Sequence, residues 1–325
     1  MTRPLTRIMQ GLFALCLSSS AWAQAGSDRI PATIKLVVPF GPGGSNDIIA
    51  RTIAPALSKR LGSNIIVENK PGAAGSIGAD SVAKSPKDGA TLLLTSSTIV
   101  TSAATMPRTT PYNVISAFAP VSIIGLGPML IAVPTSMPIK TPAELVAAAK
   151  ANPGSISYGT SGPGSIAHMS SEMLGDASNI QMLHVPYKGA AQAQLDLASG
   201  RIQMMISNYT SLLSQIKADR IRPLAITSTT SNPAFPDLPP MSTVAPGFSA
   251  EIWVAVFAPA GTPTVLIDRL NKEINEVSQL PEVKALLAAD GAQPVSLPPA
   301  GVAKLIREDF EAWKKIADAK NIRAE

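Results

Sequence analysis

The chain has 325 residues, of which 46% are hydrophobic and 15% are charged. This composition excludes an intrinsically disordered protein, and the length allows two domains of about 150 residues each. The net charge is +5, and two arginines in a segment that we expect to be removed contribute two of these charges, which leaves +3. The remaining charge forms no basic run and aromatic residues make up only 4%, so we expect no nucleic-acid partner.

The first 23 residues have the pattern of a secretory signal peptide. Arg3 and Arg7 form a positive region, residues 8–17 are apolar, and Ala-Trp-Ala at 21–23 is typical of a cleavage site. A membrane anchor would need about 20 apolar residues, more than this segment offers. We therefore predict an exported protein whose signal peptide is cleaved after Ala23.

Cys16 is the only cysteine, and it lies inside this segment. A lipoprotein signal would place small residues directly before the cysteine, whereas Leu15 stands there. The mature chain then has no disulfide, no thiol nucleophile and no thiolate metal site.

The first strand of the mature chain leads into a glycine-rich turn. Residues 34–38 are a short apolar run, residues 39–44 are rich in glycine and proline, and helical spacing begins near Ser45. Ser45, Asn46 or Asp47 can serve as the helix N-cap. Free backbone N–H groups at the positive end of a helix dipole bind anions, so this turn is predicted to form one side of a binding cleft.

The rest of the first half alternates strands and helices. Strands are predicted at 64–68 and 90–95, and a helix at 48–61 is interrupted by Pro55. This alternation is typical of a parallel sheet covered by helices, and ligands of such sheets bind at the carboxyl ends of the strands.

A similar order of elements returns after residue 154. A strand at 155–158, a glycine-rich turn at 159–165, a helix and a strand at 182–185 repeat the opening pattern. The interval from Phe40 to Asn69 is 29 residues and the interval from Thr160 to Tyr187 is 27. We therefore predict two related α/β domains that face each other, with the three closing helices packed on the first.

The motifs of common catalytic and nucleotide sites are absent. The glycines at 41, 43 and 44 do not fit Gly-x-Gly-x-x-Gly, and the turn at 159–163 does not fit Gly-x-Ser-x-Gly. The only histidines are His168 and His184, and no metal-binding spacing occurs. We predict no metal, no cofactor and no enzymatic activity.

Several polar residues remain candidates for ligand contacts. His168, early in a helix, can donate to a carboxylate or can instead hydrogen-bond a nearby loop. Lys70 and Lys188 can supply charge to an acidic ligand or can be solvated turn residues. Asp47 is interpreted as a cap or brace of the first turn. Serines at predicted strand ends are candidate hydroxyl donors: Ser96, Ser97, Ser161, Ser165 and Ser207.

Five segments then show a family resemblance. They read VPFGPGGSNDIIAR (38–51), VENKPGAAGSIGAD (67–80), DGATLLL (88–94), HVPYKG (184–189) and FAPAGTP (257–263). These segments, in this order over nearly the whole mature chain, resemble the Bug receptors, the periplasmic substrate-binding components of tripartite tricarboxylate transporters.

The resemblance implies an α/β, two-domain periplasmic-binding-protein (Venus flytrap) fold, each domain a mainly parallel sheet flanked by helices. We expect domain 1 at 28–127 plus 240–325 and domain 2 at 128–239. The implied function is a monomeric periplasmic receptor that captures a small carboxylate by hinge closure and delivers it to the membrane subunits of the transporter. The matching ligand-binding positions are Phe40, Gly43, Gly44, Ser45, Ala73, Ala74, Ser96, Ser97, Ser161, Gly162, Ser165 and His168.

One position departs from the family pattern. The family commonly has Asp-Asn after the strand that ends near 206, and this chain has Ser207 and Asn208. The missing acid favours a plain carboxylate over an amino acid. Two alternatives to a transport receptor are a solute sensor that signals to a membrane kinase and, less consistent with the missing motifs, a secreted serine hydrolase.

Overall fold

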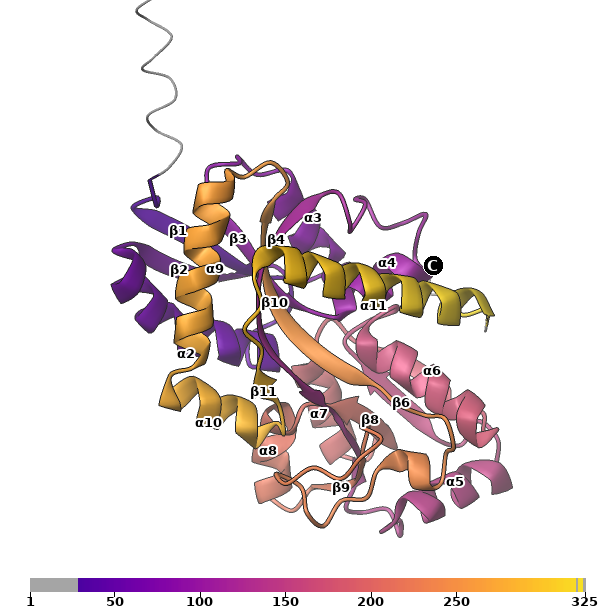
Figure 1. Cartoon of the computed structure of the whole chain (residues 1–325). Helices are drawn as coiled ribbons and strands as arrows, with labels where there is room; N and C mark the ends of the chain where they lie inside the picture. The colour runs from indigo at the N-terminus through magenta and orange to yellow at the C-terminus, as the bar shows by residue number, and fades with distance from the viewer. Residues whose placement is uncertain (1–28, 320, 324–325) are drawn as a thin grey trace, which may run out of the picture.

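The computed structural model of the chain describes residues 29–319 and 321–323. The predicted signal peptide and its cleavage site lie outside the described residues. The described chain is built on two β-sheets, each with helices on both faces (Figure 1). We call each sheet with its helices a lobe.

The first lobe contains a six-stranded sheet with the strand order β11-β4-β10-β3-β1-β2. Its strands are β1 (Thr33–Val38), β2 (Asn64–Asn69), β3 (Thr91–Ser96), β4 (Phe118–Pro128), β10 (Glu251–Pro259) and β11 (Gln293–Pro294). The second lobe contains a five-stranded sheet with the order β7-β6-β8-β5-β9. Its strands are β5 (Leu130–Pro134), β6 (Ser157–Thr160), β7 (Leu183–Pro186), β8 (Met204–Ser207) and β9 (Ile221–Ile226).

The α/β prediction is confirmed, but the sheets are mixed rather than mainly parallel. β1 pairs in parallel with β2 and β3, and β6 pairs in parallel with β7 and β8. β10 and β5, in contrast, run antiparallel to both of their neighbours. The reason is the path between the lobes: β4 carries the chain out of the first sheet and β10 brings it back, so the two strands run in opposite directions.

Helices cover both faces of each sheet. They are α2 (Ser45–Leu61), α3 (Ser76–Ala83), α4 (Thr98–Thr105), α9 (Thr264–Ser278), α10 (Pro281–Ala289) and α11 (Pro299–Ala319) in the first lobe, and α5 (Pro142–Ala151), α6 (Ile166–Ser178), α7 (Ala190–Ala198) and α8 (Tyr209–Lys217) in the second. The described residues also contain two short 3₁₀ turns, η1 (Ala73–Gly75) and η2 (Met241–Thr243). The three closing helices pack on the first lobe, as predicted.

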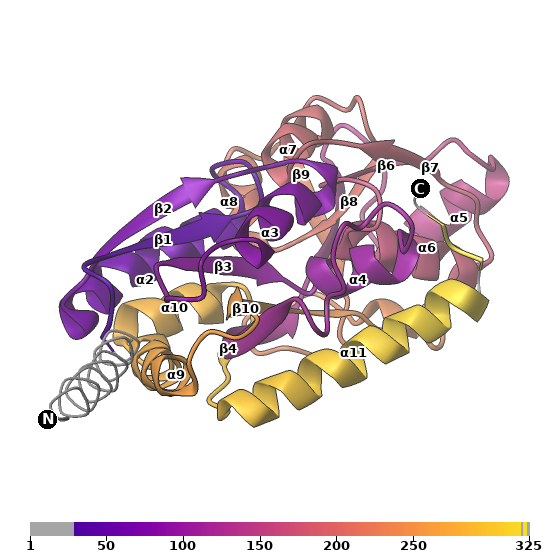
Figure 2. The same cartoon turned by 90° about the horizontal axis from the view of Figure 1, so that it is seen from above.

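Each lobe has a hydrophobic core of its own, and side chains of both lobes form a third core. Ile53 and Leu270 belong to the core beneath α2 and α9, and Leu197 and Leu212 belong to the core beneath α7 and α8. The third core contains side chains of both sheets, so apolar packing is continuous between the lobes. α11 lies along the outside of this shared core (Figure 2).

The chain passes between the lobes twice. β4 continues into β5 with only Met129 between them, and the proline-rich segment 227–250 leads from β9 to β10. The crossings lie side by side because β4 pairs with β10 and β5 pairs with β9. The expected boundaries near 127 and 239 fall close to these crossings, and the division into domains stays a prediction.

Candidate functional site

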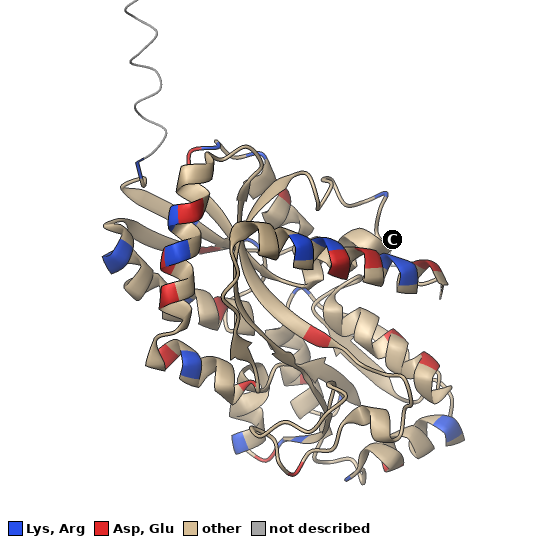
Figure 3. Cartoon of the chain, viewed as in Figure 1, with Lys and Arg blue, Asp and Glu red and all other residues tan. Residues whose placement is uncertain are grey.

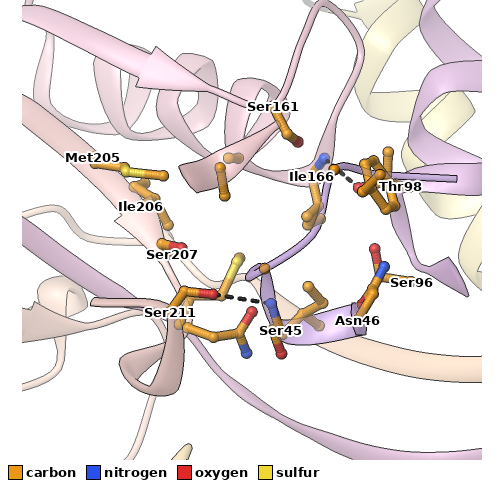
Figure 4. Close-up of a pocket in the computed structure, with 18 residues that line it drawn as sticks. Ser45, Asn46, Ser96, Thr98, Ser161, Ile166, Met205, Ile206, Ser207 and Ser211 are labelled. Carbon is orange, nitrogen blue, oxygen red and sulfur yellow. Dashed lines mark hydrogen bonds between the residues drawn. The ribbon is translucent and has the colours of Figure 1, made fainter. Parts of the chain in front are cut away.

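A cavity of about 70 Å³ lies between the lobes (Figure 4). Both lobes contribute to its wall, which is formed by Phe40, Gly41, Gly44, Ser45, Asn46, Ser96, Thr98, Met129, Ser161, Ile166, Ala167, Ala190, Met205, Ile206, Ser207, Asn208, Ser211 and Ile252.

Five helices begin at this cavity. Residues of the first turn, or the N-cap, of α2, α4, α6, α7 and α8 all line it. Each of these helices follows the carboxyl end of a strand: β1, β3, β6, β7 and β8, respectively. The first N–H groups of a helix have no partner within the helix and lie at the positive end of its dipole. The positive ends of five helix dipoles therefore meet at the cavity, and no charged side chain lines it.

The turn between β1 and α2 forms one wall. α2 begins after Gly44, which makes no side-chain cap, so the expected capping by Ser45, Asn46 or Asp47 is wrong. The backbone N–H of Ser45 instead donates to Ser211 Oγ of the second lobe at 3.1 Å. The Ser45 hydroxyl is buried at the cavity without a hydrogen-bond partner. Ser45 thus presents at the site a hydroxyl group that bonds to no other protein atom.

Asp47 braces this turn, as one of the two interpretations proposed. Its carboxylate accepts hydrogen bonds from the N–H of Gly43 at 3.0 Å, from Arg51 Nε at 3.0 Å and from Asn69 Nδ2 at 2.9 Å. Burial raises the pKa of Asp47, but the hydrogen bonds from Arg51, Gly43 and Asn69 together hold it below its usual value. Gly43, at φ +83°, closes the turn and does not line the cavity.

The end of β3 supplies two hydroxyls. Ser96 and Thr98 line the cavity, and Thr98 Oγ1 accepts from the N–H of Ile166 across the lobes at 3.2 Å. Ser97, predicted as a ligand contact, lies outside the cavity wall, and its backbone N–H donates to the carbonyl of Trp253 on β10.

The turn between β6 and α6 forms the opposing wall. Of the residues predicted here, Ser161 lines the cavity and Ser165 and His168 do not. Ser165 is the N-cap of α6 and accepts from the backbone N–H of His168. His168 Nδ1 accepts from the N–H of Gly164 at 3.0 Å, so its ring supports the turn, as the loop-bonding interpretation proposed.

His168 is part of a buried stack. Its ring lies 4.0 Å from that of His184, which in turn stacks on Tyr158. Burial lowers the pKa of His168 to about 4 and, together with the neighbouring His168, lowers that of His184 to about 4. Both rings are therefore neutral at pH 7, and neither is paired with a serine hydroxyl in the way that a hydrolase would require.

Three of the predicted residues line a second hollow between the lobes and not the cavity. Ala73, Ala74 and Gly162 form its wall together with Lys188 and others, in a space of about 440 Å³. At Gly162 (φ +128°) an added Cβ would lie 3.4 Å from the backbone nitrogen of Ala74. The lobes thus meet here backbone to backbone.

α8 is anchored from the first lobe. Its N-cap residue, Asn208, makes no side-chain cap, and Asp290 at the end of α10 takes that role. Asp290 accepts from the N–H of Thr210 at 2.6 Å and from its hydroxyl at 2.9 Å. Burial raises the pKa of Asp290 to about 6, against the lowering effect of these two hydrogen bonds.

Sequence comparison identifies the family of this two-lobed chain. The family model described as the tripartite tricarboxylate transporter family receptor matches residues 49–322. The chain belongs to this receptor family.

Individual relatives agree with this assignment. BugT of Bordetella pertussis (strain Tohama I) is 35% identical over 313 residues, which are 95% of this receptor and 96% of BugT. The structure of the periplasmic binding protein BugD has a TM-score of 0.85 and 29% identity, and covers 90% of this receptor and 99% of that chain. An R. palustris protein solved with adipate has a TM-score of 0.86 and 33% identity, with coverage of 90% and 99%.

These similarities confirm the Bug-type resemblance and the two-domain fold. They also confirm that the receptor is not an enzyme, because the family and its solved relatives are solute-binding proteins. Within the described residues, no helix is long and apolar enough to cross a membrane, and no three metal-binding side chains gather.

The receptor's cavity also contains residues that the sequence reasoning missed. They include Gly41, Asn46, Thr98, Met129, Ile166, Ala167, Ala190, Met205, Ile206, Asn208, Ser211 and Ile252. Asn46 lies two residues after the predicted turn at 39–44 and Thr98 three residues after the predicted strand at 90–95, so their place after a strand end was a usable signal. Met129 and Ile252 come from the crossing strands, where an apolar residue carries no local sign of a ligand.

Proposed function

We propose that this receptor captures a small carboxylated metabolite in the cavity between its lobes, closes over it by a hinge motion, and delivers it to the membrane subunits of a tripartite tricarboxylate-type transporter. The family assignment supports a transporter partner and a small-molecule ligand. Export through the signal peptide of residues 1–23, a periplasmic location and a monomeric state belong to the same proposal.

The convergence of five helix N-termini is the observation that carries the proposal. Each terminus places the positive end of a helix dipole, roughly half a positive charge, at the cavity. The neutral hydroxyls of Ser45, Ser96 and Ser161 add donors at the same cavity. A carboxylate fits this arrangement, and a protein 33% identical to this receptor was solved with adipate.

The hinge is proposed at the two crossings near residues 127 and 239. They divide the chain into 28–127 plus 240–325 and 128–239. Hydrogen bonds that link the lobes around the cavity, such as Ser45 to Ser211 and Thr98 to Ile166, are of the kind that would form when the lobes close.

Isothermal titration calorimetry tests the proposal. The mature protein is unfolded, dialysed to remove trapped solutes and refolded, and then titrated with mono-, di- and tricarboxylates. We expect saturable binding of at least one carboxylate. Silence toward the whole panel, from protein whose circular dichroism shows refolding, would contradict the proposal.

A further inference from the structure

Two buried acids lie at helix starts that meet the cavity. Asp47 belongs to the first turn of α2, and Asp290, at the end of α10, accepts from the N–H of Thr210 in the first turn of α8. The first turns of α4, α6, α7 and α8 contain no acid of their own. Many other charged side chains lie on outer helix faces, for example those of α9 and α11 (Figure 3). Asp47 and Asp290 therefore lie at the same helix N-termini as an anion in the cavity.

Only one of these two acids has a counter-charge. Asp47 forms an ion pair with Arg51 at 3.0 Å. Asp290 is 3% exposed, and within the described residues it bonds only to Thr210, whose N–H donates to Oδ1 at 2.6 Å and whose hydroxyl donates to Oδ2 at 2.9 Å. An ionised Asp290 is thus a buried negative charge that no cation balances.

The elements that pack against the end of α10 supply no cation to Asp290. The titratable side chains of α8, α10 and the segment 227–250 form no bond to it; they are Tyr209, Lys217, Glu282, Lys284 and Asp237. On α2 and α9, Arg60 pairs with Glu273 and Glu276 rather than with Asp290. Burial therefore dominates, and it raises the pKa of Asp290 to about 6 against the two bonds from Thr210.

The contact between α10 and α8 can persist with or without a proton on Asp290. In the ionised form both carboxylate oxygens accept from Thr210. A proton on Oδ2 can be donated to the Thr210 hydroxyl, since a hydroxyl also accepts, while Oδ1 still accepts from the N–H. Protonation thus removes the charge and keeps the cap on α8. Asn208 and Ser211, on either side of Thr210, stay at the cavity wall.

We propose that Asp290 positions the start of α8 at the cavity and takes up a proton from the solvent when an anion binds there. This inference rests on the proposed function, which supplies the anion. Two negative charges at one poorly solvated helix terminus repel each other, so a bound anion raises the pKa of Asp290 further.

The affinity for the anion must then depend on pH. It is greatest where Asp290 is protonated in both states, falls as the pH rises above about 6, and levels off above the pKa of the anion-bound form. A rise of about one pKa unit on binding changes the affinity about tenfold.

Proton uptake measured by isothermal titration calorimetry, in buffers of different ionisation enthalpy, tests the inference. The probes are propionate, succinate, adipate and citrate, and the tightest binder is used. For a rise of about one pKa unit, the wild type should take up about half a proton more per bound probe than Asp290→Asn at pH 6.5. The wild type alone gives a second readout, because its uptake should nearly vanish at pH 8.5.

The possible results separate this inference from the proposed function. Binding without proton uptake, or with the same uptake in folded Asp290→Asn, overturns the inference while the proposed function stands. Silence toward all four probes overturns the proposed function, and this inference with it.

Affinities of two further variants complete the test. Asp290→Asn should bind the probe like the wild type at pH 5 and about tenfold more tightly at pH 8, because only an ionised Asp290 repels the anion. This comparison cancels any titration of the probe itself. Asp290→Ala, which also loses the cap, should bind about fivefold more weakly than Asp290→Asn at both pH values. Equal binding by these two variants would show that Asp290 does not position α8.

Asp309→Asn is the matched control. Asp309 is a second buried acid whose pKa is raised by burial, but it accepts from Trp253 Nε1 at 2.8 Å and lies on α11, outside the cavity wall. This variant should keep the wild-type proton uptake and pH profile. Loss of the uptake in Asp309→Asn to the same extent as in Asp290→Asn would overturn the assignment to Asp290.

Discussion

At the scale of single residues, Ser45 is the side chain whose role depends most directly on a ligand. Its hydroxyl is buried and has no partner, although a buried polar group normally has one. Its backbone is fixed by α2 and by the bond to Ser211. The hydroxyl is therefore placed in advance for an acceptor that enters the cavity.

We expect Ser45→Ala to weaken carboxylate binding about 10- to 100-fold, because a hydrogen bond to a charged group contributes about 1.5–3 kcal/mol. The free energy of unfolding should not fall, since the hydroxyl has no protein partner to lose. Calorimetry with the tightest carboxylate of the panel and urea denaturation measure the two effects.

Ser170→Ala is the matched control. Its hydroxyl is also buried without a partner, but it lies on α6 outside the cavity wall. This variant should bind like the wild type. If the two alanine variants bind equally well, the Ser45 hydroxyl is not a ligand contact.

The site was predictable where a single local pattern placed a residue at a strand end. Ser96, Ser161 and Ser207 could be found because small polar residues mark the ends of β3, β6 and β8 and such ends meet ligands in α/β proteins. His168 was ambiguous because a histidine in the first turn of a helix can point to a ligand or back to its own turn. Sequence alone does not specify that choice.

At the scale of elements, α8 shows what the sequence could not specify. Asn208 is a favourable N-cap residue type, yet the helix is capped by Asp290, 80 residues beyond Thr210. The mixed sheets have the same origin: the apolar runs of β4 and β10 predict strands, but their direction depends on the path between the lobes. Local patterns identified the elements, and the contacts between distant segments had to come from the structure.

The cap on α8 gives stability a pH dependence. The pKa of Asp290 is about 6 in the folded protein, against about 3.8 for an unperturbed carboxyl, so the folded state holds the proton more tightly. Stability due to this group is therefore greatest at low pH and is lost as the pH rises from about 4 to about 6. The loss in the free energy of unfolding should be roughly 3 kcal/mol, because each pKa unit between the folded and the unfolded state corresponds to about 1.4 kcal/mol.

Asp290→Asn removes this titration, and its amide can still accept from the Thr210 N–H and donate to the hydroxyl. Urea denaturation at pH 4.5 and pH 7 should show that the wild type loses stability relative to the variant as the pH rises. Both proteins contain the two buried neutral histidines, which make stability change with pH in the opposite direction. Subtracting the free energy of unfolding of one protein from that of the other removes this contribution. A difference in the free energy of unfolding between the wild type and Asp290→Asn that does not change with pH would contradict the raised pKa of Asp290.

At the scale of the whole molecule, the lobes are held together by bonds that a hinge motion would break. Thr101 of α4 donates its hydroxyl to the carbonyl of Gly164 in the opposing turn at 2.8 Å, near the Thr98–Ile166 bond. When the lobes separate, water can satisfy the carbonyl of Gly164. If the lobes move as proposed, the bond would form only in the closed arrangement and would favour it.

Thr101→Val keeps the shape of the side chain but leaves the Gly164 carbonyl without this donor in the closed state. A buried group left unpaired costs about 1–3 kcal/mol, so we expect carboxylate binding to weaken about 5- to 100-fold. Small-angle X-ray scattering should show a larger radius of gyration for the variant at ligand concentrations that compact the wild type.

Thr52→Val is the control, because Thr52 donates within α2 to Ile48 and links no lobes. If Thr101→Val binds and compacts like Thr52→Val, closure does not depend on the contact between α4 and the β6–α6 turn, and the hinge must be stabilised by the ligand and the remaining bonds.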